Sequence, residues 1–340
     1  MSAVSEITPP AATLRRLLAG FQLSQAISVA ATLGIPDLLA HGTQTSEELA
    51  AATESHPDAL YRLLRALAAA GVLHEDEGRQ FALADLGQPL RSDAPDSLHG
   101  WAVFVGRPYY REAWSDLLHS VRTGENAFRH GHGVDVWTYR ADHPQESAIF
   151  DRAMEALTRG AVASVLEAYD FGRFGTVVDV GGGNGALLAA LLETYPAMHG
   201  IVFDQPHVVA AAEALLAARG VADRCEIVGG SFFESVPSGG DAYALKAIVH
   251  DWEDDEAIAI LHVVRRAAPP GAAILVLEAE LGAPNEALLA KLSDVNMLVG
   301  PGGRERTEAE YAALFEAAGL AYVGMTPSGT GIAVYEASVR

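Results

Sequence analysis

Polar or ionisable residues stand at the ends of apolar segments at several points in the second half of the chain. These residues are Asp179, Asp204, Ser231, His250 and Glu278. Ligands of open parallel sheets bind outside the carboxyl ends of the strands, so we expect these side chains to share one crevice. A histidine in such a crevice can act as a general base, because imidazole titrates near neutral pH.

A glycine-rich loop, Gly181-Gly182-Gly183-Asn184-Gly185, follows Asp179. Its glycines permit a tight turn, and the helix after it offers free N–H groups to a ligand. Two cofactors match this pattern. Gly181-x-Gly183-x-x-Ala186 satisfies the dinucleotide fingerprint, with Asp204 placed to bind a ribose. S-adenosylmethionine is the alternative, since it carries a sulfonium cation and a ribose but no phosphate. The Asp179 carboxylate would attract that cation and repel a pyrophosphate, which favours S-adenosylmethionine.

Strands and helices must position these residues. Apolar segments at 176–180, 200–203, 224–228, 242–248 and 272–277 alternate with helical segments at 186–194, 207–218, 253–268 and 286–298. This alternation predicts a parallel sheet with helices on both faces. The last two apolar segments, 322–326 and 331–337, are joined by a short turn and should pair as an antiparallel hairpin.

The first half of the chain has helical periodicity instead. Helices are expected over 13–40, from the N-cap Thr45 onward and over 59–70, followed by a small hairpin of 71–73 with 81–83. This order is typical of a winged helix. Residues 94–145 look irregular and rich in aromatic side chains, which pack a core or line a pocket for a flat ligand. A helix over 144–169 should link the two halves.

The composition excludes several classes of protein. The chain has 340 residues, half of them apolar, and a formal net charge of −21, so a duplex or an anionic membrane would repel it. We therefore expect no nucleic-acid and no membrane partner. The one cysteine, Cys225, excludes an internal disulfide framework. No signal peptide and no transmembrane span are evident, and we expect a cytoplasmic protein.

Four ordered motifs resemble the small-molecule O-methyltransferases, and most closely the caffeic acid O-methyltransferase-like group, which includes bacterial natural-product enzymes. These motifs are the stretches 177–185, 203–206 (FDQP), 245–252 (LKAIVHDW) and 302–307 (GGRERT). The resemblance implies an α/β fold: a Rossmann-like class I methyltransferase domain over 156–340, with a C-terminal antiparallel hairpin. A mainly helical, winged-helix-like dimerisation domain, which also walls the substrate pocket, would cover 1–155 and form a homodimer.

The resemblance also assigns roles to residues. S-adenosylmethionine, whose product is S-adenosylhomocysteine, would be bound by the residues Asp179, Gly181, Gly183, Asp204, Ser231, Phe232 and Lys246. His250 would be the general base, flanked by Glu278 and Glu305. Ser231 departs from the family, which usually has an acidic residue there, and this affects the adenine contact. We also expect Met154, Asp251, Asn296 and Met297 to border the substrate, although core packing explains the two methionines equally well.

The sequence therefore predicts an O-methyltransferase that acts on a hydroxyl, phenolic in the favoured interpretation, of an aromatic small molecule. A phenol needs a base near pH 7, and no metal site is expected. The bland alternatives are a helix-capping role for His250, a solvated carboxylate at Glu278 and a surface charge at Glu305. An NAD(P)-dependent oxidoreductase, a ligand-controlled regulator and a methyltransferase fold used for other chemistry are the competing functions.

Overall fold

The computed structural model describes residues 9–340, which form two compact units. The first unit runs to Arg111 and includes Arg152–Ala156, and the second comprises Glu112–Asp151 and Leu157–Arg340. Helix α11 (Pro144–Ala168) belongs to both units. The structure thus groups residues 112–151 with the second unit, whereas the sequence analysis places them in the first domain. The functional boundary at 155 stays a prediction.

The first unit has the predicted order of helices and strands. Its elements are α1 (Pro10–Leu18), α2 (Gly20–Thr32), α3 (Ile35–Leu39), β1 (Gln44–Thr45), α4 (Ser46–Ala52), α5 (Pro57–Ala69), β2 (Leu73–Glu75), β3 (Gln80–Leu83), the 3-10 helix η1 (Asp85–Leu90) and α6 (His99–Val105). The Thr45 side chain caps α4 in a reciprocal capping box with Glu48. Strand β1 adds to the expected hairpin, giving a three-stranded sheet in the order β1-β3-β2, which confirms the winged-helix outline.

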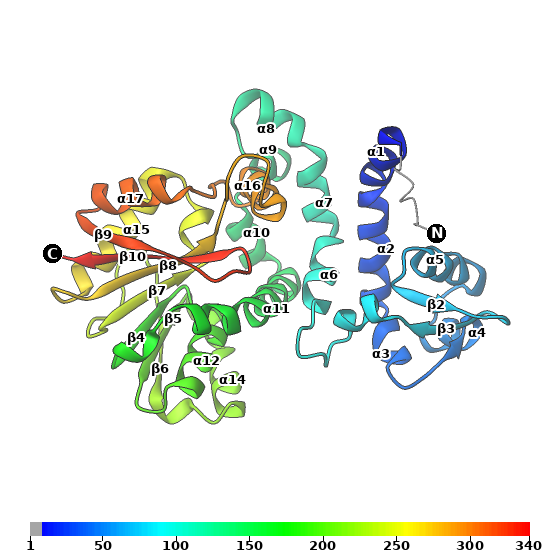
Figure 1. Cartoon of the computed structure of the whole chain (residues 1–340), viewed down its shortest axis with the longest axis horizontal. Coiled ribbons are helices and arrows are strands. Elements are labelled where there is room, and N and C mark those ends of the chain that lie inside the picture. The colour runs from blue at the N-terminus through cyan, green and yellow to red at the C-terminus, as the bar shows by residue number, and fades with distance from the viewer. Residues whose placement is uncertain (1–8) are drawn as a thin grey trace, which may run out of the picture. The chain divides into compact units, whose positions relative to one another are not determined.

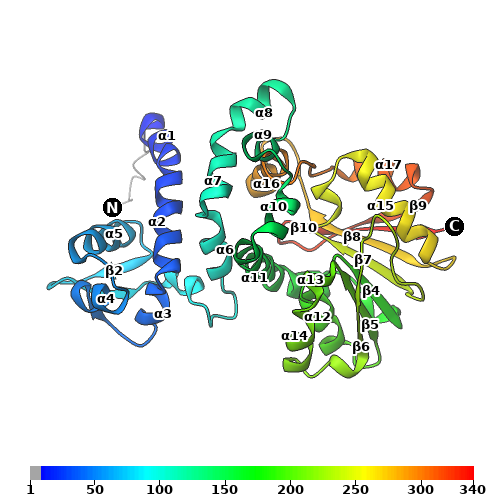
Figure 2. The same cartoon turned by 180° about the vertical axis from the view of Figure 1, so that it is seen from behind.

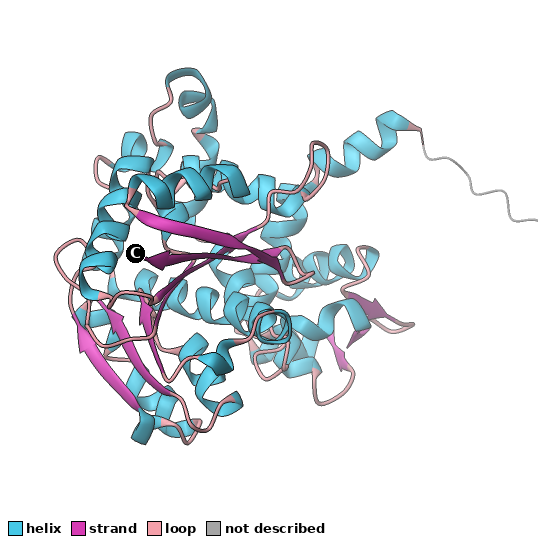
Figure 3. Ribbon diagram, turned by 60° about the vertical axis from the view of Figure 1, so that its left-hand side comes forward, coloured by secondary structure: helices cyan, strands magenta, loops and turns pink. Residues whose placement is uncertain are grey.

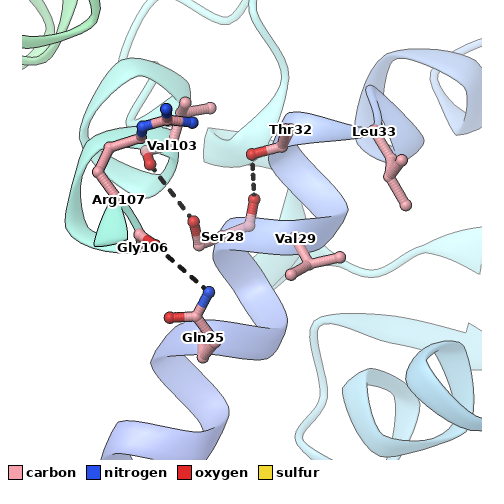
Figure 4. Close-up of a pocket in the computed structure, with 8 residues that line it drawn as sticks. All are labelled: Gln25, Ser28, Val29, Thr32, Leu33, Val103, Gly106 and Arg107. Carbon is pink, nitrogen blue, oxygen red and sulfur yellow. Dashed lines mark hydrogen bonds between the residues drawn. The ribbon is translucent and has the colours of Figure 1, made fainter. Parts of the chain in front are cut away.

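Helix α2 packs against α6 through small and polar groups. Figure 4 shows Gln25 and Ser28 reaching the carbonyl oxygens of Gly106 and Val103, both at 3.4 Å. A Cβ on Gly106 would lie 1.9 Å from the Ser28 hydroxyl oxygen, so this close approach requires glycine. Another face of α1 and α2 remains apolar and exposed, with Leu14, Leu17, Leu18 and Phe21 each more than half exposed.

Residues 94–145 are helical, which corrects the expectation of an irregular segment. They form α6, α7 (Pro108–Ser115), α8 (Leu117–Thr123), α9 (Ala127–His132) and α10 (Val136–Asp142). Asn126 caps α9 and Asp135 caps α10 with their side-chain oxygens. These helices span only one or two turns, so their hydrophobic periodicity was too short to distinguish them from loops.

A seven-stranded sheet in the order β6-β5-β4-β7-β8-β10-β9 forms the second unit (Figure 1). The strands are β4 (Thr176–Val180), β5 (His199–Asp204), β6 (Cys225–Gly229), β7 (Ala242–Lys246), β8 (Ala273–Ala279), β9 (Leu320–Pro327) and β10 (Ile332–Val339). Strands β4 to β8 pair in parallel. The predicted antiparallel hairpin is confirmed, and its second strand, β10, pairs with β8.

Helices cover both faces of this sheet, as predicted (Figures 2 and 3). One face packs against α15 (Asp254–Ala267) and α17 (Glu308–Ala317). The other packs against the C-terminal half of α11, α12 (Ala186–Thr194), α13 (Pro206–Val209) and α14 (Ala212–Ala218). Adjacent residues of β4 alternate between the two cores, Val178 in one and Val177 in the other. Helix α16 (Leu288–Val299) and the 3-10 turn η4 (Val249–Asp251) complete the second unit around its candidate site.

The helix predictions differ from the structure at three places. The helix expected over 13–40 is three helices, α1, α2 and α3. The predicted helix over 207–218 is two helices, α13 and α14, separated at Ala210–Ala211. Helix α17 was not predicted, although Thr307 and Glu310 form a capping box at its start. No helix among residues 9–340 is long and apolar enough to cross a bilayer.

Candidate functional site

The glycine loop leaves β4 with a backbone that only glycine adopts easily. Gly181, Gly183 and Gly185 have φ values of +72°, +59° and +81°. A Cβ on Gly181 would lie 2.2 Å from Cδ1 of Ile248, whereas a Cβ on Gly183 would meet no atom within 4 Å. The loop is therefore packed tightly against the β7–η4 connection at Gly181. At Gly183 it has open space, which leaves room for a ligand beside its backbone.

Asp179 lies buried beneath this loop. Its side chain is 2% exposed, and its Oδ2 atom has no hydrogen-bond partner among the described residues. Burial raises the pKa of Asp179 to about 7, although Lys246 opposes the rise. Burial also lowers the pKa of the Lys246 ammonium, against the attraction of Asp179, Glu278 and Asp251. A buried carboxylate with an unused oxygen is suited to a cationic or hydrogen-bond-donating ligand.

Asp204 stands at the end of β5, beside the glycine loop. Its Oδ2 accepts the N–H of Gly183 at 2.8 Å, and its Oδ1 accepts the N–H of Gln205 at 2.6 Å. These bonds fix the carboxylate and leave each oxygen a further lone pair for a pair of ribose hydroxyls. Burial raises the pKa of Asp204, against these two backbone bonds.

Ser231 and Phe232 lie just after β6, and their contact with an adenine stays a prediction. Ser231 is half-buried, and its hydroxyl oxygen accepts the N–H of Phe233 at 3.3 Å, which leaves the hydroxyl proton free to donate. The Phe232 ring packs edge-on against Trp252, with ring centroids 6.1 Å apart. A half-buried hydroxyl beside an aromatic ring suits an uncharged heterocycle such as adenine.

Taken together, these groups fit S-adenosylmethionine better than a dinucleotide. Asp179 and Asp204 place two carboxylates at the glycine loop, one with an oxygen that has no hydrogen-bond partner among the described residues and one held by two backbone N–H groups. The pyrophosphate of a dinucleotide would be repelled by their negative charge. The sulfonium and ammonium groups of S-adenosylmethionine would be attracted by it, and the two ribose hydroxyls would donate hydrogen bonds to it.

The turn that carries His250 is held by one buried carboxylate. Glu278, at the end of β8, is 2% exposed. Its Oε1 accepts three consecutive backbone N–H groups, those of Ile248, Val249 and His250, at 3.1, 2.9 and 3.3 Å. Ala247, just before the turn, has φ +54°, a left-handed conformation that costs about 1 kcal/mol for a residue with a side chain. The chain thus accepts backbone strain in order to bend from β7 into this turn.

The His250 ring is anchored at one nitrogen and turned toward Asp251 at the other. Nδ1 hydrogen-bonds with Oε1 of Glu305 at 2.9 Å, while Oε2 of Glu278 lies equally close but outside hydrogen-bond geometry. Nε2 lies 3.6 Å from the Asp251 carboxylate. Both glutamate side chains are fully buried, and the histidine retains 14% exposure. The carboxylates therefore fix the ring as the tautomer that carries its proton on Nδ1.

Negative charge around the ring makes it a stronger base. Burial favours neutral imidazole, but Glu278, Glu305 and Asp251 outweigh it and raise the pKa of His250 well above its usual value. Burial raises the pKa of Glu305, but attraction to His250 and hydrogen bonds from His250 and Ser293 outweigh it, so the net shift is downward. Burial raises the pKa of Asp251 to about 7, against the attraction of His250.

The structure contradicts each of the purely structural roles considered for His250, Glu278 and Glu305. His250 does not cap α15, whose N-cap residue is Glu253. Glu278 is not solvated, and Glu305 is 4% exposed rather than a surface charge. Arg304 pairs with Glu253, and Arg306 pairs with Asp254.

The expected substrate residues fall into two groups. Asp251, Asn296 and Met297 lie in the second unit, on η4 and α16. The Asn296 carboxamide oxygen accepts the indole N–H of Trp114 at 3.2 Å, and Met297 is 6% exposed. Met154 belongs to the first unit. Contact of these four residues with a substrate stays a prediction.

Several residues that hold the site were missed by the sequence analysis. Arg306 is 1% exposed and donates to Asp254 and to the carbonyl oxygens of Val249, Arg304 and Trp252. It therefore clamps both ends of the turn that carries His250. On α16, Ser293 donates to Oε1 of Glu305 at 2.7 Å, and Asp294 accepts the N–H of Glu305 at 3.0 Å. Two polar residues in a helix carry no distinctive sequence signal, and Arg306 lies within the 302–307 motif, which indicated a role only for Glu305.

His250, Glu278 and Glu305 also form the one group of three potential metal ligands within residues 9–340, with ligand atoms within 4.8 Å of one another. The Nδ1 hydrogen bond and the attraction between imidazolium and carboxylates account for this approach without a metal. Methyl transfer from a sulfonium requires no Lewis acid, so the expectation of no metal is retained.

Comparison with known proteins agrees with this geometry. The O-methyltransferase domain matches residues 114–321, and the O-methyltransferase dimerisation domain matches residues 15–92. Phenazine O-methyltransferase PhzM of Lysobacter antibioticus is 42% identical over 97% of this chain and 96% of its own. The crystal structure of LaPhzM has a TM-score of 0.94 and 41% identity, and covers 98% of this chain and all of that one.

The chain is also similar to a relative with a different activity. Aclacinomycin 10-hydroxylase RdmB of Streptomyces purpurascens is 34% identical over 92% of this chain and 85% of its own. The oxidoreductase interpretation of the glycine loop, based on NAD(P), gains no support from the matching domains, whereas the dimerisation domain supports the predicted homodimer. The chain belongs to the S-adenosylmethionine-dependent O-methyltransferases, with the dimerisation domain of that family at its N-terminal end.

Proposed function

We propose that this enzyme methylates a phenolic hydroxyl of an aromatic small molecule, with His250 as the general base. The observation that carries the proposal is the pair of buried carboxylates at Nδ1 of His250, which leaves Nε2 without a hydrogen bond from either glutamate. Anchoring one nitrogen in this way leaves the other to accept a proton. A ring that only capped a helix would not require two fully buried glutamates.

Bound S-adenosylmethionine would supply an activated methyl group, so the chain has two tasks. It must place the acceptor oxygen in line with the methyl carbon and take the acceptor's proton. A phenol has a pKa of about 10, so near pH 7 its proton must be removed as the carbon–oxygen bond forms. Nε2 of His250 would take that proton, and Glu278 and Glu305 would stabilise the resulting imidazolium. The products are the methyl ether and S-adenosylhomocysteine, with the proton left on His250.

The cofactor would be held by the residues around the glycine loop. Asp179 would face the cationic methionine portion, Asp204 would accept the ribose hydroxyls, and Ser231 and Phe232 would border the adenine. Lys246 would balance the charge of Asp179 beneath the loop, since each affects the pKa of the other. We further propose that Met154, Asp251, Asn296 and Met297 border the acceptor and that the enzyme is cytoplasmic.

The first test separates cofactor binding from catalysis. Calorimetric titration with S-adenosylhomocysteine, with NAD and NADP as parallel ligands, should show micromolar binding of S-adenosylhomocysteine alone. His250→Ala should bind it equally well and lose turnover of a phenol panel by roughly 10²–10⁴-fold. His262→Ala, which changes a half-buried histidine of α15, is the matched control. Near-wild-type turnover by His250→Ala would remove His250 from the role of base.

Hydroxylation is a second candidate because the hydroxylase relative shares the fold. The intact histidine and its two carboxylates favour methyl transfer, since a site used for other chemistry need not keep a base. Mass spectrometry of the product separates the two functions, because a methyl ether and an added hydroxyl differ in mass. A product that gains an oxygen and no carbon would contradict our assignment.

A further inference from the structure

His250 offers one Nδ1–H to two carboxylates. Oε2 of Glu278 and Oε1 of Glu305 both lie 2.9 Å from Nδ1, but only Glu305 has hydrogen-bond geometry. Glu278 is fixed independently, because its other oxygen accepts three backbone N–H groups of the turn. Within residues 9–340, the hydrogen bonds to the Glu305 carboxylate come from side chains and not from backbone N–H groups, so Glu305 depends on a different kind of support.

That support comes from two adjacent residues of α16. The Ser293 hydroxyl donates to Oε1 of Glu305, the same oxygen that binds Nδ1, at 2.7 Å. The Asp294 carboxylate accepts the backbone N–H of Glu305 at 3.0 Å. The helix therefore holds both the main chain and the side chain of Glu305. Its far end is fixed as well, since the Asn126 amide donates to the carbonyl oxygens of Leu298 and Gly300.

We propose that Ser293 is a positioning residue for the base: its hydroxyl binds the same Oε1 of Glu305 that accepts the Nδ1–H of His250, and so moderates the negative charge that Glu305 presents to the ring. The inference rests on the proposed function, and it concerns a residue that touches neither the reacting atoms nor the ring. A donor on Oε1 also withdraws electron density from the carboxylate, so Glu305 stabilises the imidazolium less than a bare carboxylate would.

This moderation matters because the surroundings of the ring are strongly acidic. The groups that face His250 and its partners come from several elements. They are Glu278 from β8, Glu305 from the segment before α17, Asp251 from the same turn, Asp294 from α16, Arg306 beside Glu305, Tyr311 from α17, Tyr335 from β10, Lys246 from β7 and Arg140 from α10. The carboxylates among them favour imidazolium, which cannot accept a proton. By weakening one of them, Ser293 keeps more of the ring neutral at a given pH.

The test compares Ser293→Ala with Ser293→Thr, which keeps a hydroxyl. Without the hydroxyl, Glu305 becomes more basic and the pKa of His250 rises. The acidic limb of kcat/KM should therefore move to higher pH by roughly 0.5–1 unit, a fraction of the effect of a full charge. At pH 7 kcat should fall about three- to tenfold, the loss of neutral imidazole that such a shift produces, whereas the Kd for S-adenosylhomocysteine should stay unchanged, because Ser293 does not touch the cofactor loop. Ser293→Thr should restore the wild-type profile.

A second measurement makes the result independent of turnover. Histidine ¹³Cε1 NMR titration of the free enzyme reports the pKa of His250 directly, with its signal assigned from His250→Gln. Ser120→Ala, which removes a buried hydroxyl from α8, controls for the loss of a buried serine. If Ser293→Ala leaves the imidazole pKa and the acidic limb unchanged, or moves them to lower pH, the proposal is overturned. If the titration shifts but no phenol is methylated by the wild-type enzyme, the proposed function fails and the positioning role stands.

Discussion

Replacing Glu305 with glutamine removes one negative charge beside the His250 ring and keeps the size of the side chain and its hydrogen-bond acceptor. The glutamine carbonyl oxygen can still accept the Nδ1–H of His250 and the Ser293 hydroxyl, which Oε1 of Glu305 now accepts at 2.9 and 2.7 Å. The volume of the side chain is unchanged, and Asp294 still holds the backbone N–H at 3.0 Å. Glu305→Gln is therefore an electrostatic perturbation of His250 with the geometry retained.

The expected size of the effect follows from the distance. At 2.9 Å and an effective dielectric constant near 20, one pair of unit charges is worth about 6 kcal/mol, which sets an upper limit. Protein carboxylates near a cation commonly shift a pKa by about 1–3 units, and Glu278 still faces the ring at 2.9 Å in the variant. We expect the pKa of His250 to fall by roughly 1–3 units from its raised value.

The sign of the pH dependence follows from the role of the ring. A general base works only when neutral, so activity should rise with pH through the raised pKa of His250. In Glu305→Gln that acidic limb should move to lower pH. The plateau rate should also fall, by roughly tenfold, because the imidazolium formed in the reaction loses a counter-charge.

The assay is the pH dependence of kcat/KM for transfer from labelled S-adenosylmethionine to a phenol, between about pH 5.5 and pH 10. Glu308→Gln, which removes a charge at the start of α17 away from the ring, is the matched control. An acidic limb that stays in place, or moves to higher pH, would refute the reasoning that Glu305 raises the basicity of His250.

Three further variants or treatments probe the rest of the site. Gly181→Ala should lose S-adenosylhomocysteine binding in calorimetry by more than tenfold, because its Cβ would lie 2.2 Å from Ile248 at φ +72°; unchanged affinity would show that the loop can move aside. Arg306→Met should lower the free energy of unfolding in urea by about 2–4 kcal/mol, since the carbonyl oxygens of Val249 and Trp252 lose a buried donor; a smaller loss would show that the turn is held by Glu278 alone. Prolonged dialysis against EDTA should leave kcat unchanged, although His250, Glu278 and Glu305 are spaced as metal ligands could be; loss of activity that zinc or magnesium restores would contradict a metal-free mechanism.

Much of the second unit could be predicted because its strands are buried on both faces. Such strands appear as short apolar runs, and the predicted strand 176–180 coincides with β4 (Thr176–Val180). The short helices of 94–145 could not be predicted in this way. Asn126 and Asp135 are residue types typical of helix N-caps, but helices of one or two turns are too short to show a hydrophobic periodicity. Helix α17 was missed for a different reason, because its apolar residues show little amphipathic separation and only the Thr307–Glu310 box marks its start.

The polar residues of the site also differ in whether the sequence alone could predict them. Asp179, Asp204 and Glu278 lie within the last residues of their strands, so the rule that ligands bind at strand ends brings them to one edge of the sheet without knowledge of the structure. Glu305 lies outside every strand, and only the family motif indicated it. Ser293 and Asp294 had neither kind of signal, because they act on the base through Glu305. Arg306 lies in the same motif as Glu305, but the motif gave it no role, because it acts through the turn.

This division has a physical origin in how the base is assembled. Strand ends fix the backbone to which a reacting group is attached, and here β8 delivers Glu278 to the turn through three backbone N–H bonds. The basicity of His250, by contrast, depends on the second carboxylate and on the donor that moderates it, which α16 and the segment before α17 supply. Residues of α16 and of the segment before α17 can be substituted without disturbing the sheet. Substitutions there can therefore adjust the pKa of the base to acceptors of different acidity while the scaffold stays the same. For this chain, that places the control of His250 in the contact between Ser293 and Glu305.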